Sequence, residues 1–148
     1  MTDKKPTKIM QSIQTELKAP KGQTNKFGGY TYRSAEDILE AVKPLLNKYN
    51  CFLTVSDEIV EVGGRVYVKA TATVTESHSD PIAVTTAFAR EAETKKGMDE
   101  AQITGSASSY ARKYALNGLF AIDDTKDPDA TNKHGKDDPQ PAYLPTEF

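Results

Sequence analysis

Residues 97–124 read GMDEAQITGSASSYARKYALNGLFAIDD and contain the longest helical pattern in the chain. Asp99, followed three residues later by Gln102, forms a capping-box signature, in which each side chain accepts a hydrogen bond from the other residue's backbone N–H. The Asn117-Gly118 pair predicts the end of the helix, because glycine adopts the left-handed conformation that follows many helices at little cost. We therefore expect a helix of about seventeen residues.

This helix has two kinds of face. Apolar side chains recur at the three-, four- and seven-residue spacing of a buried stripe, namely at Ile103, Ala107, Tyr110, Ala111 and Tyr114. Arg112 and Lys113 fall outside this stripe, and the run 105–109, GSASS, has little side-chain bulk. Since Gly, Ser and Tyr are mediocre helix formers, packing against another element must hold the helix in place. We interpret it as a docking helix with a cationic edge.

A three-stranded antiparallel sheet is predicted upstream of this helix. After Asn50 the apolar period changes from 3.6 to 2, and Gly63-Gly64 separates two β-rich runs, which is a strong hairpin signal. The turn places Ile59 opposite Val68, Val55 opposite Ala72, and Leu53 opposite Val74 on one apolar face, and it places Glu58 opposite Lys69 on the polar face. A second turn at 78–81 leads to a third strand from Ile82 to about Arg90.

Two further helices precede the sheet. Ile9, Ile13 and Leu17 predict a short amphipathic helix that ends before Pro20. Ser34 with Asp37 predicts the start of a second helix, whose apolar stripe runs from Ala35 to Tyr49. Pro44 is expected to kink or split it.

These elements predict an α+β fold, a three-stranded antiparallel β-meander flanked by helices that cover one face of the sheet. We expect a disordered N-terminus at 1–10, one folded domain at 11–124 and a disordered, acidic, Pro-rich tail at 125–148.

Residues 18–33, KAPKGQTNKFGGYTYR, interleave cations with aromatic side chains. Cations neutralise phosphates and release counterions, and aromatic rings stack on bases whatever their identity. The segment therefore favours a sequence-tolerant single-strand binder, with Tyr30 and Tyr32 as candidate stacking residues. The alternative is a loop whose aromatic side chains fill the core, and for Phe27 we favour that alternative.

Two segments also resemble a known family. GSASSYARKYALNGLFAIDD at 105–124, preceded by KFGGYTYRSAEDI at 26–38, resembles the ERF (essential recombination function) family of phage single-strand annealing proteins. That family is related to the ring-forming annealing proteins of eukaryotic recombination, and the resemblance covers roughly residues 21–124. It implies a β-β-β-α core and ATP-independent annealing of single-stranded DNA in recombination and repair, performed by a ring or filament of identical subunits.

The resemblance also assigns candidate DNA-binding residues. It places Arg112 and Lys113 in an inner groove and Lys21 and Lys26 on the opposite wall of that groove. It places Arg65, with Lys95 or Lys96, on an outer DNA-binding surface. From charge and strand facing alone we add Arg33 and Lys69. The implied partners are single-stranded DNA, the annealed duplex intermediate, other copies of the chain and, through the C-terminal tail, an exonuclease or a host single-strand-binding protein.

The charge distribution agrees with a polyanion-binding protein. The net charge is −2, but residues 1–33 carry seven cations against two acidic groups, and residues 121–148 carry three lysines against seven acidic groups. A basic N-terminal segment and an acidic C-terminal tail suit a protein that binds a polyanion, because the polyanion repels the acidic tail. The alternative is that both ends are charged only for solubility.

Several function classes are disfavoured. The sequence contains no phosphate-binding glycine loop, and one cysteine and two histidines do not make a usual zinc site. We therefore expect no cofactor, no metal and no enzymatic activity. Two alternatives stay open: a Mg²⁺-dependent nuclease that uses Asp123, Asp124, Asp127 and Asp129, and an adaptor that acts through the apolar end of its tail at 143–148.

The location of the protein is predicted from what the sequence lacks. No apolar run approaches the roughly 20 residues of a membrane span, and the first ten residues carry no apolar secretory segment. The single cysteine suits a reducing compartment. We expect a cytoplasmic protein, in the host cytoplasm if a phage encodes it.

Overall fold

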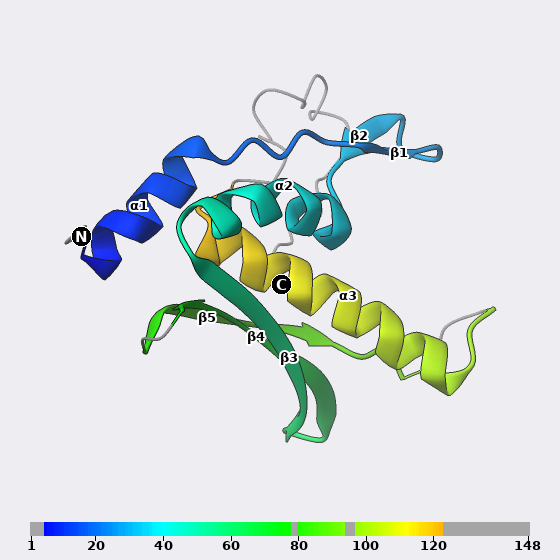
Figure 1. Ribbon diagram of the computed structural model, residues 1–148. Coiled ribbons are helices and arrows are strands. Elements are labelled where there is room, and N and C mark those ends of the chain that lie inside the picture. Colours follow the sequence, from blue (N-terminus) through cyan, green and yellow to red (C-terminus); the bar gives the residue numbers. More distant parts are fainter. Residues whose placement is uncertain (1–4, 78–79, 94–96, 123–148) are drawn as a thin grey trace, which may run out of the picture.

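The computed structural model describes residues 5–77, 80–93 and 97–122. It has the expected α+β fold, in which the described helices lie on one side of a three-stranded sheet (Figure 1). In chain order the elements are α1 (Pro6–Glu16), β1 (Gln23–Asn25), β2 (Tyr30–Tyr32), α2 (Ala35–Lys48), β3 (Cys51–Val62), β4 (Arg65–Glu76), β5 (Pro81–Arg90) and α3 (Glu100–Leu119).

The larger sheet is an antiparallel meander with β4 between β3 and β5. Gly63 and Gly64 form the β3–β4 turn with φ values of +59° and +79°, as a two-residue hairpin turn with positive φ at both positions requires. All the predicted cross-strand pairs are present, including Val55 with Ala72 and Glu58 with Lys69. The register prediction is therefore confirmed.

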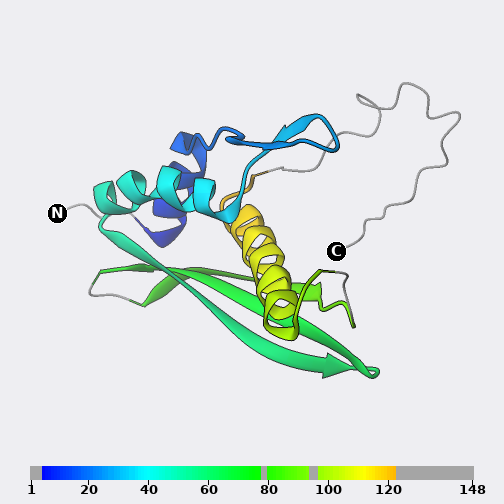
Figure 2. The same ribbon diagram turned by 90° about the vertical axis from the view of Figure 1, so that its right-hand side faces the viewer.

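One face of this sheet is covered and the other is open. On the covered face, the side chains of Val68, Ala70, Ala72 and Val74 of β4 are buried beneath α3. On the open face, Phe52, Val84 and Phe88 remain 45–57% exposed. Figure 2 shows the described helices stacked on one side of the twisted sheet. The two-layer arrangement follows from the alternation of small apolar and polar residues along β4.

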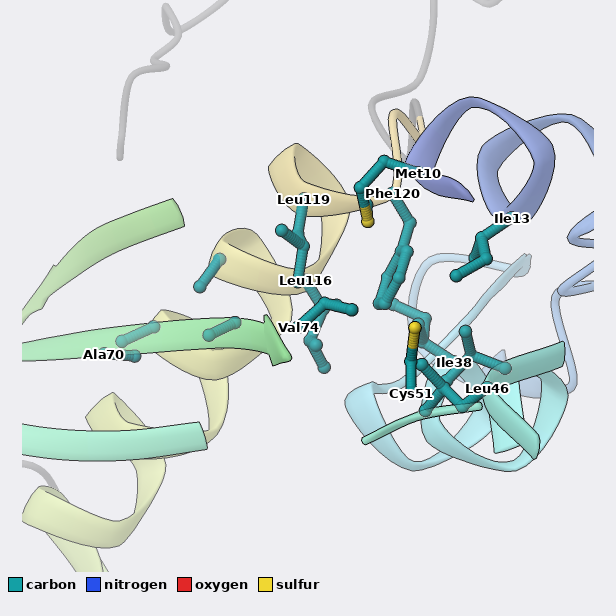
Figure 3. Close-up of a cluster of buried hydrophobic side chains, with 14 of the residues drawn as sticks. Met10, Ile13, Ile38, Leu46, Cys51, Ala70, Val74, Leu116, Leu119 and Phe120 are labelled. Atoms are coloured by element: carbon teal, nitrogen blue, oxygen red, sulfur yellow. The ribbon is translucent and has the colours of Figure 1, made fainter. Parts of the chain in front are cut away.

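The main core lies where α1, α2 and the end of α3 meet above the sheet (Figure 3). Its largest fully buried side chains are Phe120, Ile13, Ile38, Leu116 and Val42. The end of α1 is also tied to the end of α2, because Glu16 accepts hydrogen bonds from Lys48 Nζ, at 2.9 Å, and from the Tyr49 hydroxyl.

Two helices differ from their predicted extents. Helix α1 begins at Pro6, so residues 6–10 are helical and not disordered; proline is well suited to the first turn, where its missing N–H has no partner. Helix α2 has the predicted Ser34–Asp37 capping box but runs through Pro44 without splitting. Pro44 and Glu40, whose carbonyl loses its helical hydrogen bond, are both exposed, so water can satisfy that carbonyl.

The predicted end of α3 at Asn117-Gly118 is wrong by one or two residues. The helix continues to Leu119, and Ala121 takes the left-handed conformation with φ of +57° while the Ile122 N–H bonds to the Asn117 carbonyl. Burial of Leu119 and Phe120 in the core favours this extra length. Gly118 has a packing role instead, because a Cβ there would lie 3.0 Å from Thr85 Cγ2 of β5.

Candidate nucleic-acid interface

Helix α3 presents two tyrosine rings to solvent. The Asp99–Gln102 capping box is formed as predicted, and Ile103, Ala107 and Ala111 are buried as predicted. Tyr110 and Tyr114, however, are 53% and 38% exposed, and their rings stack on each other with centroids 6.2 Å apart. Their predicted burial is wrong. The alanines of α3 lie so close to the alanine-rich strand β4 that the rings are left outside this contact.

The basic-aromatic segment forms a small hairpin, β1–β2, for which the sequence analysis had assigned no strands. The Asn25 side-chain oxygen accepts hydrogen bonds from the backbone N–H groups of Phe27 and Gly28, both at 2.8 Å, and so shapes the turn. Phe27 is fully exposed at this turn, so its predicted core position is wrong. Figure 1 shows the hairpin projecting on the helix side of the fold, away from the three-stranded sheet.

The hairpin and α3 come together through a cation and a ring. Lys113 Nζ of α3 lies 5.3 Å from the centroid of the Tyr32 ring of β2, within the range of an attractive cation–π contact. Tyr32 in turn packs edge-on against Tyr30, with centroids 6.3 Å apart. We call the surface formed by Tyr30, Tyr32, Tyr110, Lys113 and Tyr114 the hairpin–helix surface. It brings together one cation and four aromatic rings from segments about eighty residues apart.

Arg112 faces the sheet rather than the hairpin. Its Nε donates to Asp57 of β3 at 3.1 Å, and the Ser108 hydroxyl donates to the same carboxylate. Burial of the Asp57 carboxyl would raise its pKa, but the hydrogen bonds from Arg112 and Ser108 outweigh this effect and lower the pKa. Arg112 is thus a link between α3 and β3, although 44% of its side chain stays exposed.

The Asp57 contact gives stability a specific pH dependence. Because its pKa in the folded chain lies below the ordinary value of 3.8, Asp57 stabilises the fold above that pH, and the contribution is lost as pH falls through the lowered pKa. We expect Asp57→Asn to be less stable than the parent at pH 7, with the difference shrinking below about pH 4. Denaturant unfolding across pH 2–7 measures this.

The exposed Asp80 supplies a matched control for that experiment, since Asp80→Asn makes the same chemical change. Its stability profile should follow that of the parent chain. A difference between the parent and Asp57→Asn that stays constant from pH 7 to pH 2 would contradict the role given to the carboxylate.

The other predicted site residues lie in several places. Lys21 and Lys26 are exposed beside and within the β1–β2 hairpin. Arg33 is partly buried, and its Nε donates to the Ala19 carbonyl at 2.6 Å, so it fastens the segment before the hairpin. Lys69 lies on the open face of the sheet, 5.9 Å from the Phe88 ring centroid.

Arg65 lies at the far end of the β3–β4 hairpin. There it shares a hollow of ≈880 Å³ with Arg90 and three glutamates, Glu91, Glu93 and Glu100. Lys95 and Lys96 lie outside the described residues. The structure therefore brings Lys113, Tyr30 and Tyr32 together and places Arg65 and Lys69 elsewhere.

The alternative acidic site is not part of the described structure, since Asp123, Asp124, Asp127, Asp129 and the tail lie outside it. Within residues 5–77, 80–93 and 97–122, no three His, Cys, Asp or Glu side chains gather in a way that could hold a metal ion. None of the described helices is long and apolar enough to cross a membrane.

Comparison with known proteins places this chain in a family. The family model described as the ERF superfamily matches residues 7–145. The chain belongs to the ERF superfamily. The match extends beyond residues 21–124, over which the two segments suggested the resemblance, and it includes α1 at one end and part of the tail at the other.

One relative of this ERF chain is the Essential recombination function protein of Salmonella phage P22, which is 57% identical over 133 residues. The alignment covers 90% of this chain and 63% of the relative, so the chain spans less than two thirds of that protein's length. No solved structure matches the chain.

Sequence reasoning missed Tyr110 and Tyr114 as members of the interface of this ERF chain. A signal was present, because Ala107, Ala111 and Ala115 recur every four residues and form a stripe narrow enough for close packing on a sheet. Tyr110 and Tyr114 each precede an alanine of this stripe, so both rings lie on the same side of it, where they stack on each other. The alanine spacing therefore indicates the part of α3 that packs closely on the sheet.

Proposed function

We propose that this protein binds single-stranded DNA on the hairpin–helix surface and anneals complementary strands without ATP during recombination. The observation that carries the proposal is the contact of Lys113 with Tyr32. This contact between two partly buried side chains joins the two sequence segments on which the family resemblance rested. The recombination role is supported by the name of the P22 relative.

The chemistry of the surface suits an unpaired strand. A lysine neutralises phosphate charge, and exposed rings stack on bases of any identity, each stacked base contributing about 1–3 kcal/mol. Contacts of this kind carry no sequence code. The base pairs formed with the second strand would then supply the driving energy, since duplex stacking is worth ~1.4 kcal/mol per step.

Assembly of several copies is part of this proposal. A single hairpin–helix surface covers few nucleotides, so an annealing protein of this size must act as an oligomer. Strands β3 and β5 are the two edges of the described sheet, and long strand edges with unpaired backbone groups favour pairing with another chain. We propose that these edges join neighbouring subunits in a ring or filament.

The test uses the full chain and two complementary labelled oligonucleotides. We expect salt-sensitive binding of each single strand, annealing in the absence of ATP, and a solution mass several times that of the 16.2 kDa chain. A monomer that binds neither strand at low ionic strength would refute the proposal.

Two further measurements separate the alternatives. With Mg²⁺ present, the labelled strands should keep their length, whereas a nuclease would shorten them. Deletion of residues 125–148 should leave strand binding in place, whereas an adaptor that works through its tail would lose its function.

A further inference from the structure

A cavity opens beside the contact between the hairpin and α3. It has a volume of ≈420 Å³, which falls within the roughly 300–1,000 Å³ typical of small-ligand sites. Tyr32 and Tyr110 line it from opposite elements, together with the cation of Lys113. The hydroxyl-bearing residues Ser34, Ser106 and Ser109 also line it. The cavity is therefore bounded by two aromatic rings, one cation and several small polar groups.

Gly105 helps to keep this cavity open. A Cβ at Gly105 would meet no atom within 4 Å, so no neighbouring group in the described chain requires a glycine there. Glycine is nevertheless the least favourable residue after proline in a helix interior. Gly118 on the same helix differs, because its missing Cβ makes room for Thr85. Gly105 lines the same cavity as Tyr110 and Tyr32, so a larger side chain at this position would have room on that side of the helix.

We propose that this cavity is a nucleobase pocket, which takes one unpaired base of the bound strand between Tyr32 and Tyr110. The phosphate beside that base would then lie near Lys113. This inference rests on the proposed function and makes it more specific. Aromatic faces stack on any base, and serine hydroxyls both donate and accept hydrogen bonds, so the pocket takes all four bases. A paired base cannot enter, which gives the protein a preference for single strands.

The pocket also imposes an order on annealing. A base held between the two rings is withdrawn from pairing, so it must leave the pocket before a complementary strand can use it. The neighbouring bases outside the pocket are available first. Each subunit thus fixes the bound strand at one nucleotide and exposes the nucleotides on either side.

The experiment compares oligo(dT) with an abasic oligonucleotide of equal length and charge, by fluorescence anisotropy at fixed ionic strength. The parent chain should bind oligo(dT) about fivefold or more tightly than the abasic strand, as expected for one stacked base. Gly105→Leu should fill the cavity and weaken oligo(dT) binding by about fivefold or more, as expected for the loss of one stacked base, while abasic binding is unchanged. Leucine is a better helix former than glycine, so the thermal midpoint of Gly105→Leu should not fall.

The control variant is Ala101→Leu, at an exposed position of α3 that does not line the cavity. It should keep the full preference for oligo(dT). Equal binding of both strands by the parent chain, or an oligo(dT) affinity of folded Gly105→Leu equal to that of the parent, would overturn the pocket and leave the annealing proposal standing. Failure of the parent chain to bind either strand would overturn the proposed function itself.

Discussion

Replacement of Phe120 by alanine is expected to lower the free energy of unfolding by about 3–5 kcal/mol. Phe120 is only 1% exposed and is the largest fully buried side chain. In the view of Figure 3 its ring lies between Ile13 of α1 and Leu116 of α3. The substitution leaves a cavity where α1, α2 and α3 meet, in a fold whose total stability is expected to be about 5–15 kcal/mol.

Denaturant unfolding at one fixed protein concentration measures this change, and the chain provides its own control. Phe27→Ala makes the same chemical change at a fully exposed position and should shift stability by no more than about 0.5 kcal/mol. If both variants unfold at the same denaturant concentration, the position of Phe120 in the core is incorrect.

The contrast between these two phenylalanines shows what sequence could not decide. Phe27 lies between a lysine and two glycines, and nothing local distinguishes an exposed ring at a hairpin turn from a ring that folds back into a core. The decision depends on the Asn25 side chain, which closes the turn with two backbone hydrogen bonds and holds Phe27 outward. These two hydrogen bonds join residues that are close in the sequence. They produce no periodic pattern of apolar residues from which the position of Phe27 could be predicted.

The sheet, in contrast, could be predicted almost residue by residue. Two adjacent glycines fix the type of turn, the turn fixes the register, and an alternation with period 2 fixes the faces. The pairing of Val55 with Ala72 required no information from elsewhere in the chain. Both capping boxes could also be predicted from the sequence, because a capping box depends on two residues only three positions apart.

The candidate site was harder to predict from the sequence than the sheet, because the site depends on contacts between residues that are far apart in the chain. Neither the pairing of Arg112 with Asp57 across fifty-five residues nor the contact of Arg33 with the Ala19 carbonyl leaves a sequence pattern. The family resemblance therefore placed Arg112 and Lys113 together in one groove, although Arg112 Nε is engaged with β3. Lys113, its neighbour, is the residue of the pair that faces the aromatic rings.

Because Lys113 and Arg112 contact different parts of the fold, we expect substitution of Lys113 to have a large effect on the affinity for single-stranded DNA. Lys113→Glu should weaken binding of single-stranded DNA by tenfold or more at low ionic strength, because a cation beside the strand is replaced by an anion. In an oligomer every subunit would carry this change. The slope of log affinity against log salt should also become shallower, by about 0.7 for each phosphate that the variant no longer neutralises.

The matched control for Lys113→Glu is Lys43→Glu, an equal change of charge on α2. Lys43 is 65% exposed and pairs with Glu40, and it does not line the cavity next to Lys113. Anisotropy titrations at several salt concentrations should show almost parental binding for this variant. Equal losses of affinity in the two variants would mean that net charge, and not the hairpin–helix surface, determines affinity.

Arg112 separates a structural effect from a binding effect in the same assay. Arg112→Ala removes the hydrogen bond from Arg112 Nε to the Asp57 carboxylate, so it should destabilise the fold and change strand binding less than Lys113→Glu does. Lys113→Glu should reduce binding more strongly, because Lys113 lies beside the Tyr32 ring of the hairpin–helix surface. Affinity and unfolding free energy measured on both variants thus test whether the hairpin–helix surface, rather than the α3–β3 contact, binds the strand.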